Sequence, residues 1–455
     1  MAGLRDLAVI HLTFEGIQTY GGGVATVTRG HIGALPMVKR ELEQQGLRLT
    51  PYFAEIATLP EHERADPSYE QRAVREIHAM GGEVGFLVNY TRGMEPTSTW
   101  GVPALGELEN WKAACASGAA VALNWARRHE MAVVFCHDSL FALAPLYATL
   151  QAAAFPAHVV AVYVVHSTAL IHELPLPNPQ RLMVESVGVH WPKIVDGARL
   201  GSISDFMSRH IVEEYGARPE TIVPTGNGIN PFDPMFRLRS REEIVAKLQS
   251  YGVPLDRPLI FSWGRPVPYK RYDVFLRAAA RLKGRVHPVL AVFPDYPEME
   301  RLARDLGLAV TLVKAFDPEF VACMLQWEGT VAACSLAFQE PFGLTPAETR
   351  MHARKQGPLM VVSDTGGLVE QVVDGVDGFV TRQDDPDDVA RVIVQILAMP
   401  PERKAEVRRA GLERVLRDYT WPVQMLRTLA ALVPEVQRFE ERVHQRLVQE
   451  ALARV

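Results

Sequence analysis

The sequence is poor in cysteine, in excess charge of either sign and in long apolar runs. Its four cysteines (115, 136, 323 and 334) form no C-x-x-C pair, which argues against a disulfide framework or a zinc knuckle. Forty-eight basic and 53 acidic residues give a net charge of −5, so no nucleic-acid partner is expected. No stretch approaches the roughly 18 uncharged apolar residues of a membrane-spanning helix. Because the first residues lead straight into a strand-like run without a cleavage site, we expect a cytoplasmic protein with no integral membrane segment.

Several catalytic motifs are also missing. The chain contains no H-E-x-x-H and no G-x-S-x-G, so zinc hydrolases and α/β-hydrolases are not supported. It also lacks the G-x-G-x-x-G fingerprint of dinucleotide binding after its first strand-like run, which disfavours a hydride-transfer enzyme.

Short apolar runs alternate with turns and helical patterns along most of the chain. The runs include residues 7–14, 83–89, 131–138, 158–167, 199–204, 258–265, 287–293, 308–316, 329–335 and 357–364. Such runs between helices are typical of parallel sheets covered on both faces. One helix is clearly marked, because Asp385 is a candidate N-cap and apolar residues from Val389 to Leu397 recur at helical spacing.

A segment without periodicity separates two such series. Residues 225–236, TGNGINPFDPMF, are rich in Gly, Pro and Asn. We therefore expect an α/β fold of two Rossmann-like doubly wound domains, over 1–225 and 226–420, with a helical segment over 421–455. Ligands bind such sheets at the carboxyl ends of the strands, so we expect a cleft there.

An acidic loop follows the apolar run that ends at residue 335. It reads AFQEPFGLTPAE (337–348), with Glu340 in the loop and Glu348 in the first turn of a following helix. The amides of Gly343, Leu344 and Thr345 would lie at the helix N-terminus, where phosphate oxygens are favoured. Two carboxylates flanking such amides suit a nucleotide sugar, with hydroxyls at both ends and phosphate between. The alternative is a helix cap beside a surface glutamate.

Two cations follow another apolar run. In FSWGRPVPYKRYD (261–273), Arg265 and Lys270 are joined by a stiff segment with two prolines. A guanidinium fork and an ammonium charge together can neutralise a diphosphate, although a single Arg-Lys pair is more often ordinary surface charge.

Glycines and histidines mark strand ends in the first half. Gly22 and Gly23 belong to a GGG run that would let the backbone approach an anion. His137-Asp138 and His166-Ser167 each end an apolar run. Two histidines in the same position favour a functional role over that of satisfied polar residues.

Together these motifs resemble the retaining nucleotide-sugar glycosyltransferases of the GT-B fold, which include glycogen and starch synthases and many group 1 glycosyltransferases. The resemblance is densest from 258 to 382, where GRPVPYK, EPFGLTPAE and SDTGGLVEQVVDGVDGFV match family elements. It implies a C-terminal nucleotide-sugar-binding domain, an N-terminal acceptor-side domain and a C-terminal helix that crosses back to the first domain.

The resemblance also implies roles for single residues. Arg265 and Lys270 would bind the donor diphosphate, Glu340 the sugar hydroxyls and Glu348 the ribose hydroxyls. His166 would lie beside the reacting carbon. The remaining donor-side and acceptor-side residues would be Gly22, Gly23, Asn227, Gly343, Leu344, Thr345, His137 and Asp138.

The implied activity is metal-independent transfer of a hexosyl unit, of glucose type, to an acceptor hydroxyl with retention of configuration. The donor would be a UDP-, ADP- or GDP-sugar, with no cofactor and no metal, and the protein could form a homo-oligomer. A glycan-polymer or disaccharide synthase of the glycogen, trehalose or sucrose type is an alternative. Tyr20 stands where bacterial glycogen and starch synthases carry a lysine, which argues against glucan synthesis from an ADP-sugar. A nonenzymatic sugar-nucleotide sensor is a second alternative.

Overall fold

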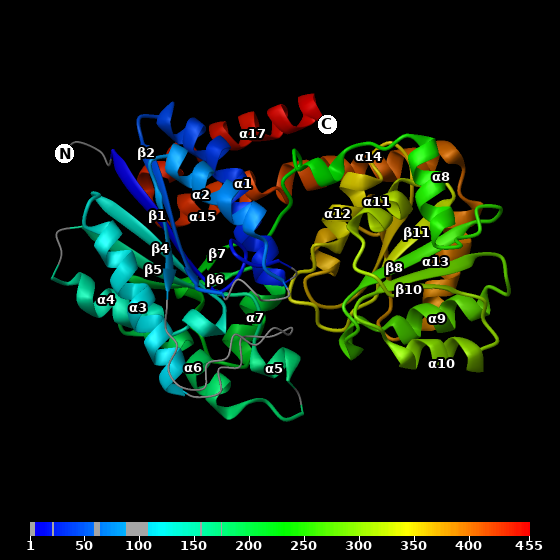
Figure 1. The fold of residues 1–455 in the computed structure, drawn as a ribbon, viewed down its shortest axis with the longest axis horizontal. Helices are drawn as coiled ribbons and strands as arrows, with labels where there is room; N and C mark the ends of the chain where they lie inside the picture. Colours follow the sequence, from blue (N-terminus) through cyan, green and yellow to red (C-terminus); the bar gives the residue numbers. More distant parts are fainter. Residues whose placement is uncertain (1–4, 21, 59–63, 88–107, 155–156, 174) are drawn as a thin grey trace. The chain divides into compact units, whose positions relative to one another are not determined.

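The computed structural model describes residues 5–20, 22–58, 64–87, 108–154, 157–173 and 175–455. The chain divides into two compact units (Figure 1). The first comprises Met1–Asn230 and Trp421–Gln449, and the second Pro231–Thr420 and Glu450–Val455.

The first unit is a parallel sheet covered by helices on both faces. Within the described residues the sheet has seven strands in the order β3-β2-β1-β4-β5-β6-β7. The strands are β1 (Asp6–Thr13), β2 (Arg48–Ile56), β3 (Glu83–Leu87), β4 (Met131–His137), β5 (His158–Val165), β6 (Ala198–Ser202) and β7 (Ile222–Pro224). The helices are α1 (Gly23–Glu43), α2 (Pro67–Ala79), α3 (Leu108–Ala126), α4 (Ala144–Ala152), α5 (Ala169–His172), α6 (Pro179–His190), α7 (Asp205–Glu213), α15 (Trp421–Leu432) and α16 (Pro434–Gln437), followed by α17 (Glu440–Arg454).

Alternate side chains of the central strands enter different layers. Ala8, Ile10 and Leu12 of β1 belong to the apolar core that α3 and α4 cover. His11 faces the opposite side of the sheet, since successive strand residues point to opposite faces. Helix α15 packs beside α1 and against β7, so the C-terminal segment is part of the first unit (Figure 1).

The second unit is again a parallel sheet with helices. Its strands, six in the part of the chain described, run in the order β10-β9-β8-β11-β12-β13. They are β8 (Leu259–Gly264), β9 (His287–Val292), β10 (Thr311–Val313), β11 (Thr330–Ser335), β12 (Leu359–Ser363) and β13 (Phe379–Thr381). The helices are α8 (Arg241–Ser250), α9 (Tyr272–Arg281), α10 (Pro297–Asp305), α11 (Pro318–Gln326), α12 (Thr345–His352), α13 (Pro386–Ala398) and α14 (Pro401–Asp418).

The predicted fold class is confirmed, because both units are doubly wound parallel sheets. The predicted cap is confirmed as well, since the Asp385 side chain accepts hydrogen bonds from the Asp387 and Asp388 amides at the start of α13. In each unit the strand order reverses once, between β1 and β4 and between β8 and β11. Doubly wound sheets bind ligands at such a reversal, on the carboxyl side of the strands.

Candidate functional site

The second unit brings the predicted cations and carboxylates to its strand-order reversal. Arg265 and Lys270 follow β8, and Glu340 follows the neighbouring β11. Lys270 Nζ lies 2.5 Å from Glu340 Oε2, and both side chains are largely buried. Burial of the ammonium group lowers the pKa of Lys270, but the charge and hydrogen bond of Glu340, together with Tyr269, outweigh this effect and raise the pKa above its ordinary value. Lys270 is therefore a cation at neutral pH.

Arg265 belongs to the same arrangement. Its Nη2 donates to the Tyr269 hydroxyl at 2.9 Å, and the Tyr269 carbonyl accepts from the Phe338 amide at 2.7 Å. The segment after β8 is thus bonded directly to the loop after β11. This fixes the backbones that carry Arg265, Lys270 and Glu340.

A glycine turn and a buried glutamine form hydrogen bonds to the backbone of the loop that carries Glu340. Gly367 N donates to Glu340 O at 2.8 Å, and a Cβ on Gly366 would lie 2.4 Å from that oxygen. Gln371 Nε2 donates to Phe342 O at 2.8 Å and to Gly343 O at 2.9 Å. Gln371 was not predicted from the sequence, where its only signal was its place after the glycine turn.

The predicted amide cradle lies at the start of α12. Leu344 is the N-cap residue, and no side chain of the described residues caps this helix end. Gly343 has φ +75°, a left-handed conformation that favours glycine. Glu348 lies in the first turn, as predicted, and burial raises its pKa to about 7 although the charge of Lys270 lowers it.

In the first unit, three histidines come together at the carboxyl ends of β1, β4 and β5. His11 Nδ1 lies 2.9 Å from His137 Nε2, and His137 Nδ1 lies 2.9 Å from His166 Nε2. His11 and His137 are buried, whereas His166 is partly exposed. The predicted acceptor-side residue His137 therefore lies behind His166.

Asp138 is buried beside this group and has φ 61°, which is strained for a residue other than glycine. Burial raises the pKa of its carboxyl group, although the charge of Arg181 opposes this. Asp138 accepts a hydrogen bond from the Ser167 hydroxyl at 3.3 Å. Asn227 is also buried, and its Oδ1 has no hydrogen-bond partner among the described residues.

Gly22 and Gly23 stand at the N-terminus of α1, but a carboxylate already occupies this place. Glu15 Oε1 accepts from the Ala25 amide at 3.1 Å, and a Cβ on Gly22 would lie 1.8 Å from the same oxygen. A phosphate approaching these glycines would therefore meet Glu15. Glu15 was not among the residues predicted from the sequence.

A buried network under the first unit's loops was also missed. Arg181 and Glu185 of α6 form an ion pair at 2.8 Å, and Arg181 also binds Glu173 at 2.7 Å. Arg181 Nη2 donates to the Ser167 hydroxyl at 2.8 Å. The i, i+4 spacing of Arg181 and Glu185 was visible in the sequence. Only the fold places this pair beside Ser167, the residue that follows His166.

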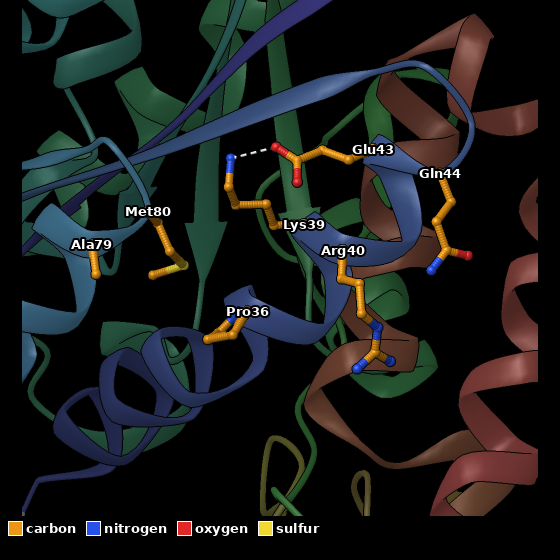
Figure 2. A pocket seen from close by; sticks show the side chains of 7 residues that line it. All are labelled: Pro36, Lys39, Arg40, Glu43, Gln44, Ala79 and Met80. Atoms are coloured by element: carbon orange, nitrogen blue, oxygen red, sulfur yellow. Dashed lines mark ion pairs between the residues drawn. The ribbon is translucent and has the colours of Figure 1, made fainter.

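A surface hollow lies between the second half of α1 and the end of α2. It is lined by Pro36, Lys39, Arg40, Glu43, Gln44, Ala79 and Met80 (Figure 2). Lys39 and Glu43 form an ion pair across 2.7 Å there. Since α1 runs from the carboxyl edge of the sheet to its amino edge, this hollow lies away from the histidines, and no predicted site residue lines it.

Among the described residues, no helix combines the length and apolar character needed to cross a bilayer. The four cysteines are buried and unpaired.

Comparison with known proteins points to one group of enzymes. Residues 244–413 match the family model "Glycosyl transferases group 1". D-inositol 3-phosphate glycosyltransferase 2 of Catenulispora acidiphila is 31% identical over 242 residues, covering 50% of this chain and 54% of the relative. The chain thus spans about half the length of such relatives.

Solved structures cover nearly the whole chain at lower identity. Sucrose-phosphate synthase from Thermosynechococcus elongatus has a TM-score of 0.66 and 17% identity, covering 95% of this chain and 99% of that one. Anabaena HepE in complex with UDP-glucose has a TM-score of 0.58 and 15% identity, covering 97% and 99%. At these identities the likeness establishes the fold.

Proposed function

We propose that this chain, whose residues 244–413 match the glycosyl transferases group 1 model, transfers a hexosyl unit from a nucleoside-diphosphate sugar to an acceptor hydroxyl. The observation that carries this proposal is the convergence of Arg265, Lys270, Glu340 and Glu348 at the strand-order reversal of the second unit. The match to a structure that holds UDP-glucose supports the donor class.

In this proposal the cations act on the leaving group. Negative charge builds on the diphosphate as the bond from the anomeric carbon to its oxygen lengthens. Arg265, Lys270 and the amides of residues 343–345 would stabilise that charge, and preorganised groups of this kind supply much of the rate in similar reactions. Because Lys270 remains protonated beside Glu340, its charge is in place before the donor arrives.

The carboxylates would bind the two ends of the donor. Glu340, fixed by Lys270 and by the glycine turn, would accept hydrogen bonds from sugar hydroxyls. Glu348 would bind the ribose hydroxyls from the first turn of α12. In the first unit, His166 would contact the transferred sugar, while Asp138 and Asn227 would line the site behind it.

We further propose retention of configuration and metal independence. None of the named carboxylates stands out as a nucleophile for double displacement, so the acceptor hydroxyl would attack on the face that the diphosphate leaves. Arg265, Lys270 and the backbone amides would take the charge-stabilising role of a divalent ion.

The acceptor would be a small polyol or a sugar. The inositol 3-phosphate named for the relatives makes polyol phosphates the first class to test. A disaccharide-phosphate synthase is the second candidate, because sucrose-phosphate synthase shares the fold over nearly the whole chain.

A thermal-shift panel of UDP, ADP, GDP and TDP, followed by their glucose forms, tests the proposal. A bound nucleotide at 100 times its dissociation constant should stabilise the fold by about 2.7 kcal/mol. Nucleosides without phosphate serve as controls and should have a much smaller effect. The preferred donor is then assayed with inositol 3-phosphate, glucose 6-phosphate and fructose 6-phosphate. The absence of stabilisation by every nucleotide and sugar nucleotide would contradict the proposal.

A further inference from the structure

The three histidines of the first unit form a chain of rings joined edge to edge. The His11 and His137 ring centroids lie 5.3 Å apart with planes 11° from parallel, and those of His137 and His166 lie 5.2 Å apart at 18°. The facing nitrogens are 2.9 Å apart in both pairs. In each pair, the distance between ring centroids equals the N···N distance plus the two distances from centroid to nitrogen. Both nitrogens therefore lie on the line that joins the two centroids. The rings are therefore nearly coplanar and linked by in-plane N–H···N bonds.

The inner end of the chain is sealed and rigid. His11 lies between Phe53 and Phe135, whose ring centroids are 4.6 and 5.0 Å away with planes 11° and 22° from parallel. These are its register partners on β2 and β4. Its Nε2 is buried and has no hydrogen-bond partner among the described residues. Neither ring rotation nor solvent is available to satisfy this atom.

All three rings are neutral at pH 7. Burial lowers the pKa of His11 and His137 well below the ordinary value, and it lowers the pKa of His166 to about 4. A neutral imidazole carries one N–H donor and one lone pair. In a series of neutral rings, each linking bond needs one donor and one acceptor, so all three rings must adopt the same tautomer.

Two arrangements are then possible, and they differ at the two ends. If each ring carries its proton on Nδ1, His11 Nε2 is a bare lone pair and His166 presents an N–H. If each carries it on Nε2, the core contains an N–H without an acceptor and His166 presents a lone pair. Buried N–H groups without a partner are rare in proteins, which favours the first arrangement.

We propose that His11 and His137 are positioning residues, which hold His166 in the Nδ1–H tautomer so that it donates a hydrogen bond to a substrate oxygen. Only the identification of that oxygen as part of a sugar nucleotide or acceptor rests on the proposed function. The sealed end of the chain determines the state of the partly exposed end, two rings away.

A metal centre is the competing use of these residues. One nitrogen each from His11, His31 and His137 lies within 4.8 Å of the others. However, His11 Nδ1 and His137 Nε2 point at each other across 2.9 Å, which leaves no room for an ion between them. The hydrogen-bonded chain accounts for both nitrogens.

The test is a long-range ¹H–¹⁵N NMR spectrum of the full chain with ¹⁵N-labelled histidine, which reports the tautomer of each ring. In the unsubstituted protein, His11, His137 and His166 should all be Nδ1–H. In His11→Asp, the carboxylate can accept from His137 Nε2–H, so His137 and His166 should both switch to the Nε2–H tautomer. His31→Phe is the control, because His31 adjoins His11 but is outside the chain; it should leave His166 unchanged.

A second variant guards against poor folding of the first. The amide nitrogen of His11→Asn can donate to His137 Nε2, so this variant should retain Nδ1–H at His166 and keep kcat close to that of the unsubstituted enzyme. His11→Asp, which turns the donor at His166 into a lone pair, should lower kcat by about tenfold, the range for one hydrogen bond. An Nε2–H tautomer at His166 in the unsubstituted protein, an unchanged His166 tautomer in His11→Asp, or stoichiometric bound metal in the purified protein would overturn the proposal. The tautomers are measured without substrate, so a failure of the proposed transferase activity would be recognised separately.

Discussion

At the residue scale, Lys270 is the predicted site residue whose contact the geometry defines most closely. Lys270 lies in the loop after β8, and its ammonium group forms an ion pair with Glu340 in the loop after β11. The bond keeps the charge in place, and removal of Lys270 would also take this contact away from Glu340. Activity and stability must therefore be measured together.

Substitution of Lys270 by alanine should lower kcat by about 10²–10³, the effect expected for one transition-state charge stabiliser. Arg265→Ala should have an effect of similar size. Arg277→Ala, which removes an exposed cation from nearby α9, is the control and should leave kcat unchanged. Steady-state kinetics with the donor found by thermal shift, alongside thermal melts, makes the measurement. Turnover near the unsubstituted level in Lys270→Ala would remove this residue from the mechanism.

Glu348 provides a pH-dependent prediction at the same scale. Its pKa is about 7 in the folded protein, against an ordinary value of 4.5. Between pH 4.5 and pH 7, Glu348 keeps its proton in the folded state but has released it in the unfolded state. The free energy of unfolding should therefore decrease as pH rises from about 4.5 to 7.

Urea unfolding at pH 5, 6 and 7 measures this dependence. Glu348→Gln should reduce the decrease, whereas Glu413→Gln, at an exposed position of α14, should not. Equal pH dependence in the two variants would show that Glu348 titrates normally.

At the scale of elements, the N-terminus of α1 combines a predicted phosphate contact with an internal carboxylate. Glu15 accepts from the Ala25 amide, where a phosphate near Gly22 and Gly23 would bring further negative charge. Glu15→Gln should therefore strengthen binding of a nucleoside diphosphate by about 1 kcal/mol, the size of one charge pair in a solvent-exposed site.

Calorimetry with the diphosphate and with the free nucleoside measures the effect, which should be confined to the diphosphate. Glu43→Gln is the control, since Glu43 lies at the other end of α1 beside Lys39 (Figure 2). Equal gains for nucleoside and diphosphate would mean that phosphate does not reach this helix end.

Helix α15 shows how the C-terminal segment is held in the first unit. Trp421 is buried, its edge meets His31 of α1, and its amide donates to Ile229 O at 2.9 Å. A Cβ on Gly30 would lie 2.1 Å from Trp421 Nε1. Gly30 is therefore required for the two helices to pack closely.

Gly30→Ala should destabilise the protein by about 1–3 kcal/mol, the usual cost of overpacking a core. Gly23→Ala is the matched control on the same helix, because a Cβ there meets nothing within 4 Å. Chemical denaturation followed by tryptophan fluorescence compares them. Equal stabilities would mean that Trp421 moves aside at little cost.

At the scale of the whole molecule, the proposed chemistry needs neither an added metal ion nor a covalent intermediate. Activity should therefore survive EDTA, and an α-linked donor should give an α-linked product. NMR of the anomeric proton, on enzyme stripped of metal, tests both expectations. A β-linked product would contradict retention, whereas activity that requires added Mn²⁺ would contradict the leaving-group argument alone.

Local sequence patterns were sufficient for the fold class. Apolar runs separated by helical patterns indicated two doubly wound sheets, and the group 1 glycosyl transferase model matches residues 244–413, the region that holds the motifs between 258 and 382. Strands β2 and β7 lie outside the predicted runs, because β2 contains Pro51 and charged residues and β7 has only three residues. The roles of the individual site residues stay predictions.

The sequence alone determined which residues follow each strand, because glycine, proline and charged residues mark where an apolar run ends. Only the tertiary structure decided which of them meet. Lys270 and Glu340 are 70 residues apart and become partners because β8 and β11 are neighbours. His11 and His137 are 126 residues apart and bond because β1 pairs with β4. Strand order is set by packing over the whole sheet, and no local pattern records it.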